Sequence, residues 1–254
     1  RLYLYQKKGE GKPFTQEEQQ EWERILARYH QVCKLAKKKE VEVLIDAEES
    51  WMQDVTDDLV EEMMLTYNTE VPIVYTTLQL YRWDRLDYLK QLHKRAKQQG
   101  FSLGIKIVRG AYMEKERERA EDKGYPSPIC ETKEATDHNF NETLKYILNN
   151  LEDMSLFVGT HNEESCYLAM QLMEKYKIAK QDNRVWFGQL YGMSDHISFN
   201  LANQGYNVAK YVPFGPVKDV MPYLIRRAEE NTSVAGQTNR ELNLLKTERK
   251  RRKL

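Results

Sequence analysis

The chain has 254 residues, enough for one large domain or two small ones with a substantial core and no disulfide or metal staple. Its 39 basic and 39 acidic residues give zero net charge, which indicates neither nucleic acid nor an anionic membrane as a partner. No apolar run approaches membrane-span length, and the three widely spaced cysteines favour a reducing, intracellular compartment. The first residue is Arg1 rather than Met, so we expect a truncated or processed chain.

The chain opens with a strongly marked helix. "FTQEEQ" predicts a capping box, with Thr15 as the N-cap and Glu18 three residues later. Apolar residues then recur at helical spacing from Trp22 to Cys33. Further helices are predicted near 57–67, 86–99 (closed by Gly100), 137–150, 163–177, 194–204 and 222–231.

Six apolar or β-branched runs alternate with these helices. They are "VEVLIDAEES" (41–50), "VPIVYTTLQLY" (71–81), "SLGIKIVRGAY" (102–112), "SLFVGTHN" (155–162), "RVWFGQLYGM" (184–193) and "NVAKYVPFG" (207–215). Continuous apolar runs are typical of strands covered on both faces of a parallel sheet. The order predicts either a doubly wound sheet or a (β/α)8 barrel. No GxGxxG follows a strand, so the Rossmann fingerprint is missing.

Each predicted strand ends in a polar or charged residue. In a barrel these ends converge on one face, where active sites lie. The residues are Asp46, Gln79, Arg109, His161, Gln189 and Tyr211.

The first and third strands carry the clearest chemistry. Asp46 closes an apolar strand and should point into the barrel mouth, whereas Glu48 and Glu49 read equally well as acids at a helix N-terminus. "GIKIVRGAY" places Lys106 and Val108 on one face and Ile107 and Arg109 on the other. Gly110 then allows a close backbone approach. A cation beside Gly-Ala suits a flavin ring or a phosphate; a strand-end charge in solvent is the alternative.

The remaining candidates are weaker when each is taken alone. His161 lies at a strand end, and the five histidines show no HxH or HExxH spacing, so no metal site is predicted. Arg226 and Arg227 diverge by about 100° on one helix, with Glu230 a turn later. From composition alone, a solvated Arg–Glu face is favoured over a fork that holds a carboxylate.

In combination the motifs resemble a known family. "LIDAEES", "KIVRGAY", "GTHN", "FGQLYGM", "YVPFGP" and "YLIRRAEEN", in this order, are similar to the flavin-dependent proline dehydrogenases, and most similar to the stand-alone, mitochondrial-type members. The resemblance runs from about residue 41 to 234. It implies a distorted (β/α)8 TIM-type barrel with the last helix over the strand ends, and non-covalent FAD. The implied reaction oxidises L-proline to Δ1-pyrroline-5-carboxylate by hydride transfer to flavin N5, with electrons passed to a quinone.

The resemblance also implies residue roles. Arg226 and Arg227 would bind the substrate carboxylate, Asp46 and Tyr211 would line the substrate ring, and Glu230 would lie near the flavin or the amine. Lys106 stands where some bacterial members carry arginine near flavin N5, which keeps a cation but loses a bidentate contact. Flavin contacts would fall to Gln79, Lys106, Val108, Arg109, Gly110, Ala111, Tyr112, Thr132, Lys133, His161, Asn162 and Gln189.

One departure concerns the start of the chain. Family members have a first barrel strand with a lysine that contacts the carboxylate, and nothing upstream of residue 41 matches it. With six strands predicted rather than eight, the barrel is expected to lack its N-terminal strand or strands. The predicted division is 1–40 as a helical segment or insertion, 41–240 as the barrel and 241–254 as a basic tail.

Tyr211 is bulky enough to crowd the 4-hydroxyl of hydroxyproline, so a preference for proline is expected. Three alternatives stay open: a lyase or aldolase with Lys106 as a Schiff-base lysine, a hydroxyproline dehydrogenase, and an inactive interaction module.

The expected location is cytoplasmic or mitochondrial. The tail "KTERKRRKL" is expected to be a solvated end, with peripheral docking on an inner membrane as the alternative.

Overall fold

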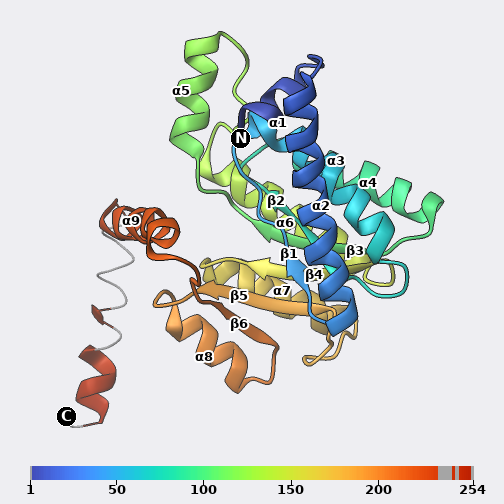
Figure 1. Ribbon diagram of the computed structural model, residues 1–254. Helices are drawn as coiled ribbons and strands as arrows, with labels where there is room; N and C mark the ends of the chain where they lie inside the picture. Colours follow the sequence, from blue (N-terminus) through green and yellow to red (C-terminus); the bar gives the residue numbers. More distant parts are fainter. Residues whose placement is uncertain (1, 234–241, 244–245, 253–254) are drawn as a thin grey trace.

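Six parallel strands form one curled sheet in the computed structural model, which describes residues 2–233, 242–243 and 246–252, without the side chains of 226–233. The strands pair in chain order: β1 (Val43–Leu44), β2 (Val74–Gln79), β3 (Leu103–Val108), β4 (Met154–Gly159), β5 (Val185–Leu190) and β6 (Val208–Tyr211). The predicted parallel α/β class and the six strands are confirmed. Among the described residues β1 and β6 each pair on one side, which makes the sheet a half-barrel of (β/α)8 type (Figure 1).

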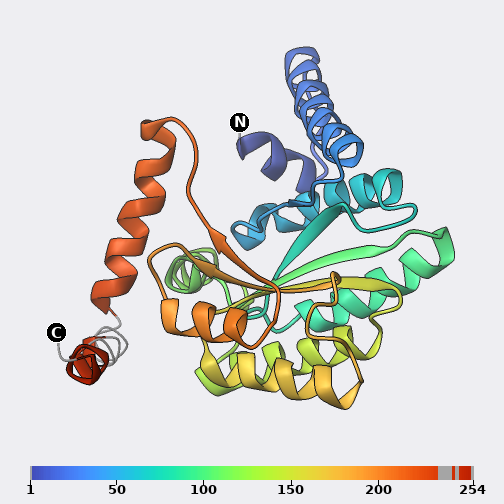
Figure 2. The ribbon, with the colours of Figure 1, turned by 90° about the horizontal axis from the view of Figure 1, so that it is seen from below.

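Helices alternate with the strands and cover the outer face of the curled sheet (Figures 1 and 2). The two N-terminal helices precede the sheet and pack on α3. The helices are α1 (Leu2–Gly9), α2 (Gln16–Lys39), α3 (Ser50–Tyr67), α4 (Arg85–Gln99), α5 (Met113–Lys123), α6 (Lys133–Asn149), α7 (Glu163–Lys175), α8 (Asp195–Asn203) and α9 (Val217–Ser233).

Local sequence signals fix several helix ends as predicted. The Glu18 amide donates to Thr15 Oγ1 at 3.3 Å, and the Thr15 amide donates to Glu18 Oε2 at 2.7 Å, which completes the capping box of α2. Gly100 ends α4 with a left-handed φ of 75°, and its amide donates to the Ala96 carbonyl.

Alternate side chains of each strand point to opposite faces of the sheet. On β3, Ile105 and Ile107 are fully buried against the helices, whereas Lys106 and Val108 point to the inner face and are half-buried. The predicted division of this strand is therefore confirmed. The core lies between the sheet and its outer helices, which leaves the inner face for polar chemistry.

Glycines leave room for aromatic rings on the inner face. A Cβ at Gly104 would lie 2.6 Å from the ring of Tyr75, its register partner on β2. A Cβ at Gly188 would overlap the ring of Phe157 on the neighbouring strand. Each ring therefore occupies space that a side chain on the adjacent strand would need.

Helix α9 lies on the side of the sheet to which the carboxyl ends of the strands point, beyond the end of β6 (Figure 2). It follows the segment 212–216, which contains Pro213 and Pro216. The ring of Tyr223 lies 5.5 Å from that of Tyr211, while Leu224 and Ile225 are about half exposed. The extended, proline-flanked connection places α9 at the open side of the half-barrel.

Candidate functional site

Asp46 and Lys106 form an ion pair at the carboxyl edge of the sheet. Asp46 lies two residues after the end of β1, and Lys106 lies on the inner face of β3, two strands away. The Lys106 ammonium donates to Asp46 Oδ1. Lys106 is 15% exposed and Asp46 is 54% exposed, so the carboxylate faces the open mouth while the lysine lies beneath it. The structure thus brings together two residues that are far apart in the sequence.

Gln79 ends β2 on the same inner face, in register with Val108. Its side chain is 3% exposed, and its Oε1 atom has no hydrogen-bond partner among the described residues. A buried amide oxygen without a donor is costly unless a ligand supplies one. Gln79 is therefore suited to accept a hydrogen bond from an N–H group of a ligand that binds on the inner face of the sheet.

Arg109 points to the helices rather than into the mouth. Its guanidinium donates to Asp137 at 2.8 Å, Thr160 at 2.9 Å and Ser165 at 3.0 Å, and it stacks on the Phe140 ring. Burial alone would raise the pKa of Asp137, but hydrogen bonds from Lys133 and Arg109 hold that pKa below its usual value. The Arg109 side chain ties β3 to α6 and α7.

Gly110 fits beneath an aromatic ring. Its φ is +126°, and a Cβ would lie 2.5 Å from the ring of Tyr81. The close approach predicted for this glycine is made by the protein's own Tyr81 ring. Exposed Ala111 follows it, and Tyr112 is the N-cap residue of α5.

Gly110→Ala should lower the free energy of unfolding by about 2–4 kcal/mol, because it adds an overlap to an unfavourable backbone conformation. The measurement is urea denaturation. Gly124→Ala is the matched control: its φ is also positive, at +68°, but nothing lies within 4 Å of its Cβ position, so only about 1 kcal/mol should be lost. Equal losses would show that the Tyr81 contact is unimportant.

Several predicted ligand residues have their side chains engaged within the fold. Thr132 and Asn162 cap α6 and α7 by accepting from the amides of Ala135 and Ser165. Lys133 pairs with Asp137, and His161 Nδ1 lies 2.9 Å from Ser194 Oγ. Gln189 points toward α8; its amide group donates to the Thr160 carbonyl and accepts from the Ser198 hydroxyl. Any ligand contact by Thr132 or Asn162 would therefore fall mainly to the backbone.

Tyr211 ends β6 and is half exposed at the open side of the curl. The predicted carboxylate fork and its acid lie further on, on α9. The backbone there is helical through Ser233, and the side chains of Arg226, Arg227 and Glu230 lie outside the described residues. The helical spacing of the two arginines is thus present, and their contacts remain a prediction.

Sequence reasoning missed the residues that hold the loop between β1 and α3. The Tyr112 hydroxyl donates to Glu48 at 2.6 Å, and buried Glu116 accepts from both the amide and the hydroxyl of Ser50. Glu49 occupies the N-cap position of α3 without a side-chain cap bond. A glutamate on a highly charged helix gave no signal that it would be buried.

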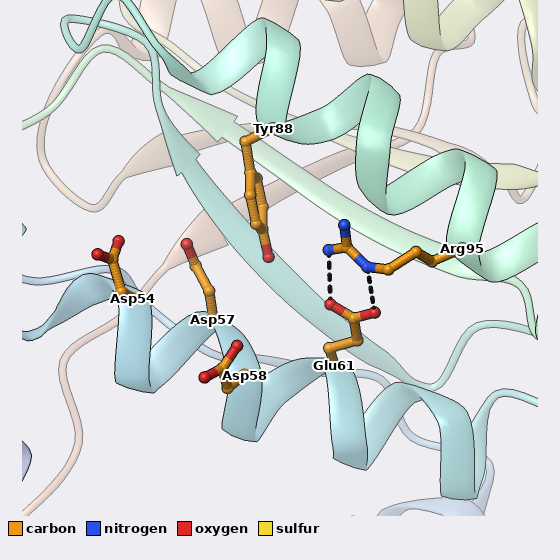
Figure 3. A pocket seen from close by; sticks show the side chains of 6 residues that line it. All are labelled: Asp54, Asp57, Asp58, Glu61, Tyr88 and Arg95. Carbon is orange, nitrogen blue, oxygen red and sulfur yellow. Dashed lines mark hydrogen bonds and ion pairs between the residues drawn. The ribbon is translucent and has the colours of Figure 1, made fainter. Parts of the chain in front are cut away.

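A pocket of about 490 Å³ lies elsewhere, between α3 and α4 (Figure 3). It is lined by Asp54, Asp57, Asp58, Glu61, Tyr88 and Arg95. Arg95 bridges to Glu61 with two bonds of 2.7 and 2.8 Å, so part of this lining is internally neutralised. The lining contains none of the carboxyl-edge residues.

The half-barrel, with polar side chains at the carboxyl ends of its strands, places the protein in the (β/α)8 class. Residues 4–240 match the family model for proline dehydrogenase. The chain therefore belongs to the proline dehydrogenase family, and the match includes α1 and α2 as well as the sheet.

Relatives of known name agree with this assignment. The chain is 41% identical over 242 residues to human "Proline dehydrogenase 1, mitochondrial", covering 94% of this chain and 40% of that protein. It is 36% identical to the Arabidopsis thaliana protein of the same name, covering 98% and 51%. Proline utilization A from Bdellovibrio bacteriovorus, solved after inactivation by N-propargylglycine, superimposes with a TM-score of 0.78 at 28% identity, over 85% of this chain and 22% of that one. The chain thus spans about half or less of these relatives.

Proposed function

We propose that the protein oxidises L-proline to Δ1-pyrroline-5-carboxylate. FAD, held without a covalent link, would supply the oxidant by accepting a hydride at flavin N5 from the ring carbon next to nitrogen, and would pass the electrons to a quinone. The family match over residues 4–240 carries the proposal. The Asp46–Lys106 pair and the unpartnered Gln79 oxygen support it by placing a carboxylate, a cation and a free acceptor on one face.

The chain's own residues would act by binding and orientation. Asp46 and Tyr211 would line the substrate ring, with the cationic amine attracted to the Asp46 carboxylate. Arg226 and Arg227 would hold the planar substrate carboxylate through charge-assisted hydrogen bonds. Fixing the ring in this way supplies much of the rate of a hydride transfer. Glu230 would lie near the amine or the cofactor.

The inner face fits a flavin in one specific respect. Gln79 Oε1 is a buried acceptor without a donor among the described residues, and a flavin ring carries an N–H donor. The cation of Lys106 beside it would stabilise negative charge on a reduced ring. The other proposed cofactor contacts are Val108, Arg109, Gly110, Ala111, Tyr112, Thr132, Lys133, His161, Asn162 and Gln189.

The test is proline-dependent reduction of an artificial dye by the full-length protein, with the visible absorbance of the purified protein recorded alongside. A yellow protein that reduces the dye only with proline is expected. A colourless protein that cleaves a small carboxylate would favour the lyase alternative. Against that alternative, Lys106 is engaged by Asp46, whereas a Schiff-base lysine needs a free amine.

Tyr211→Ser should raise the ratio of kcat/KM for 4-hydroxyproline to that for proline by about tenfold, because it opens space beside the substituted ring carbon. Steady-state rates with both substrates give the ratio. Tyr167→Ser, which removes an exposed tyrosine from the outer helix α7, should leave it unchanged. An unchanged ratio in Tyr211→Ser would remove this tyrosine from the specificity of the site and reopen the hydroxyproline alternative.

None of the described helices is both long and apolar enough to span a bilayer. The human and Arabidopsis relatives are named as mitochondrial. We propose a mitochondrial location for this protein too, with peripheral contact to the membrane that holds the quinone. The basic segment 241–254, which the structure describes only in part, is the proposed contact.

A further inference from the structure

Beyond Ile45, the loop that carries Asp46 is held mainly by one other segment of the chain. This segment runs from Lys106 on β3 into α5. Lys106 binds Asp46, Tyr112 donates to Glu48 at 2.6 Å, and a third attachment follows at the start of α3. At its start the loop is held by β2, because the Ile45 amide donates to the Tyr75 carbonyl at 2.9 Å and the Thr77 hydroxyl donates to the Ile45 carbonyl at 2.7 Å.

The third attachment is the most buried. Glu116 is 1% exposed, and its two carboxylate oxygens accept from the Ser50 amide and the Ser50 hydroxyl, each at 2.5 Å. Ser50 is the first residue of α3, whose N-cap residue Glu49 makes no side-chain cap bond. Amides in the first turn of a helix lack internal partners and favour an anion. Glu116 therefore caps α3 from a different helix.

We propose that Glu116 is a positioning residue for Asp46 and so determines the affinity for the substrate amine. Ser50 follows Asp46 by four residues, so fixing the first turn of α3 limits where the Asp46 carboxylate can lie. Lys106 then completes the arrangement from beneath. This inference rests on the proposed function, since it takes Asp46 to face the substrate ring.

The experiment compares three variants of the full-length protein. Glu116→Leu removes both hydrogen bonds. Glu116→Gln is the conservative variant, because its amide can accept from the Ser50 N–H and donate to the Ser50 hydroxyl oxygen. Glu118→Leu is the matched control, since Glu118 lies exposed on the same helix. Steady-state kinetics with L-proline and amide hydrogen exchange of residues 45–50 are measured for each.

Glu116→Leu should raise the KM for L-proline about tenfold with kcat changed less than about threefold, and should accelerate exchange in residues 45–50. Glu116→Gln and Glu118→Leu should resemble the parent in both measurements. A Glu116→Leu protein with parental KM would overturn the proposal, even if exchange were faster, because Glu116 would then be only structural. Equal effects of the Leu and Gln variants would also overturn it.

Two further outcomes can be told apart: a Glu116→Leu variant that does not fold, and a parent protein that does not oxidise proline. If Glu116→Leu fails to fold, Ser50→Ala removes one of the two hydrogen bonds and should produce the same changes at smaller size; no change would overturn the proposal. If the parent does not oxidise proline, the proposed function fails. The exchange difference between Glu116→Leu and Glu118→Leu then decides whether Glu116 holds the Asp46 loop, and equal exchange overturns that.

Discussion

Replacing either Arg226 or Arg227 by alanine should raise the KM for L-proline by about 30- to 150-fold. Each guanidinium is proposed to make a charge-assisted hydrogen bond to the substrate carboxylate, and losing such a bond costs about 2–3 kcal/mol. Rates at saturating proline should fall less, because in each single variant the other arginine, Asp46 and Tyr211 would still contact the bound substrate. Steady-state dye reduction by the full-length protein measures both parameters.

Lys218→Ala is the control for the arginine variants, because it removes an exposed cation from the same helix without touching the pair. It should leave KM unchanged. The competing interpretation of Arg226 and Arg227 is a solvated face paired with Glu230, which would contribute only a few tenths of a kcal/mol to stability. Parental KM values in both alanine variants would support that interpretation and end the proposal of a carboxylate fork.

Replacing Arg85 by leucine should lower the free energy of unfolding by about 3–5 kcal/mol, because it leaves a buried carboxylate without its cation. Arg85 is 5% exposed and donates to Asp57, which is 4% exposed, at 2.7 Å. It also donates to Asp84 at 2.6 Å. Urea denaturation of purified protein measures the loss.

The matched control is Arg95→Leu. Arg95 also joins α4 to α3, through two bonds to Glu61, but it is 37% exposed (Figure 3). Exposed pairs contribute roughly 0–1 kcal/mol because water screens the charges. If the Arg85 and Arg95 variants lost equal stability, burial would not explain the importance of Arg85.

The Arg85→Leu loss should also depend on pH. Burial raises the pKa of Asp57, and Arg85 opposes that shift, so removing Arg85 raises the folded-state pKa further. A carboxyl group with a raised folded pKa binds more protons when folded than when unfolded. It therefore destabilises the fold increasingly as pH rises above the unfolded pKa. The variant's deficit should be larger at pH 8 than at pH 5, and a deficit independent of pH would argue against Asp57 as its cause.

The helices and strands that are specified by residues close together in the sequence were predictable. Thr15 and Glu18 are three residues apart and complete their capping box without help from the rest of the chain. Each of the six predicted runs contains an observed strand, although β1 and β6 are only partly buried. Asp46 was correctly predicted to lie at the carboxyl edge of the sheet, because it follows the last apolar residues of a strand. The family's motifs added the roles of the residues.

Side-chain partnerships across the fold were not predictable. Lys106 and Asp46 are 60 residues apart, and Glu116 and Ser50 are 66 apart, so no local pattern relates them. Arg109 was expected to meet a ligand, yet its strand parity already placed it on the face opposite Lys106, and its partners come from α6 and the β4–α7 region.

The rings that lie over glycines on the inner face have an evolutionary consequence. Tyr75 with Gly104, and Phe157 with Gly188, each share one volume between adjacent strands. A larger residue at either glycine is tolerated only if the facing aromatic shrinks at the same time. The two residues of each pair should therefore be substituted together, so substitutions at 75 and 104, or at 157 and 188, should be correlated among homologues. A shift of one strand by a single residue would separate every ring from its glycine, so the same pairs also guard the alignment of the strands during folding.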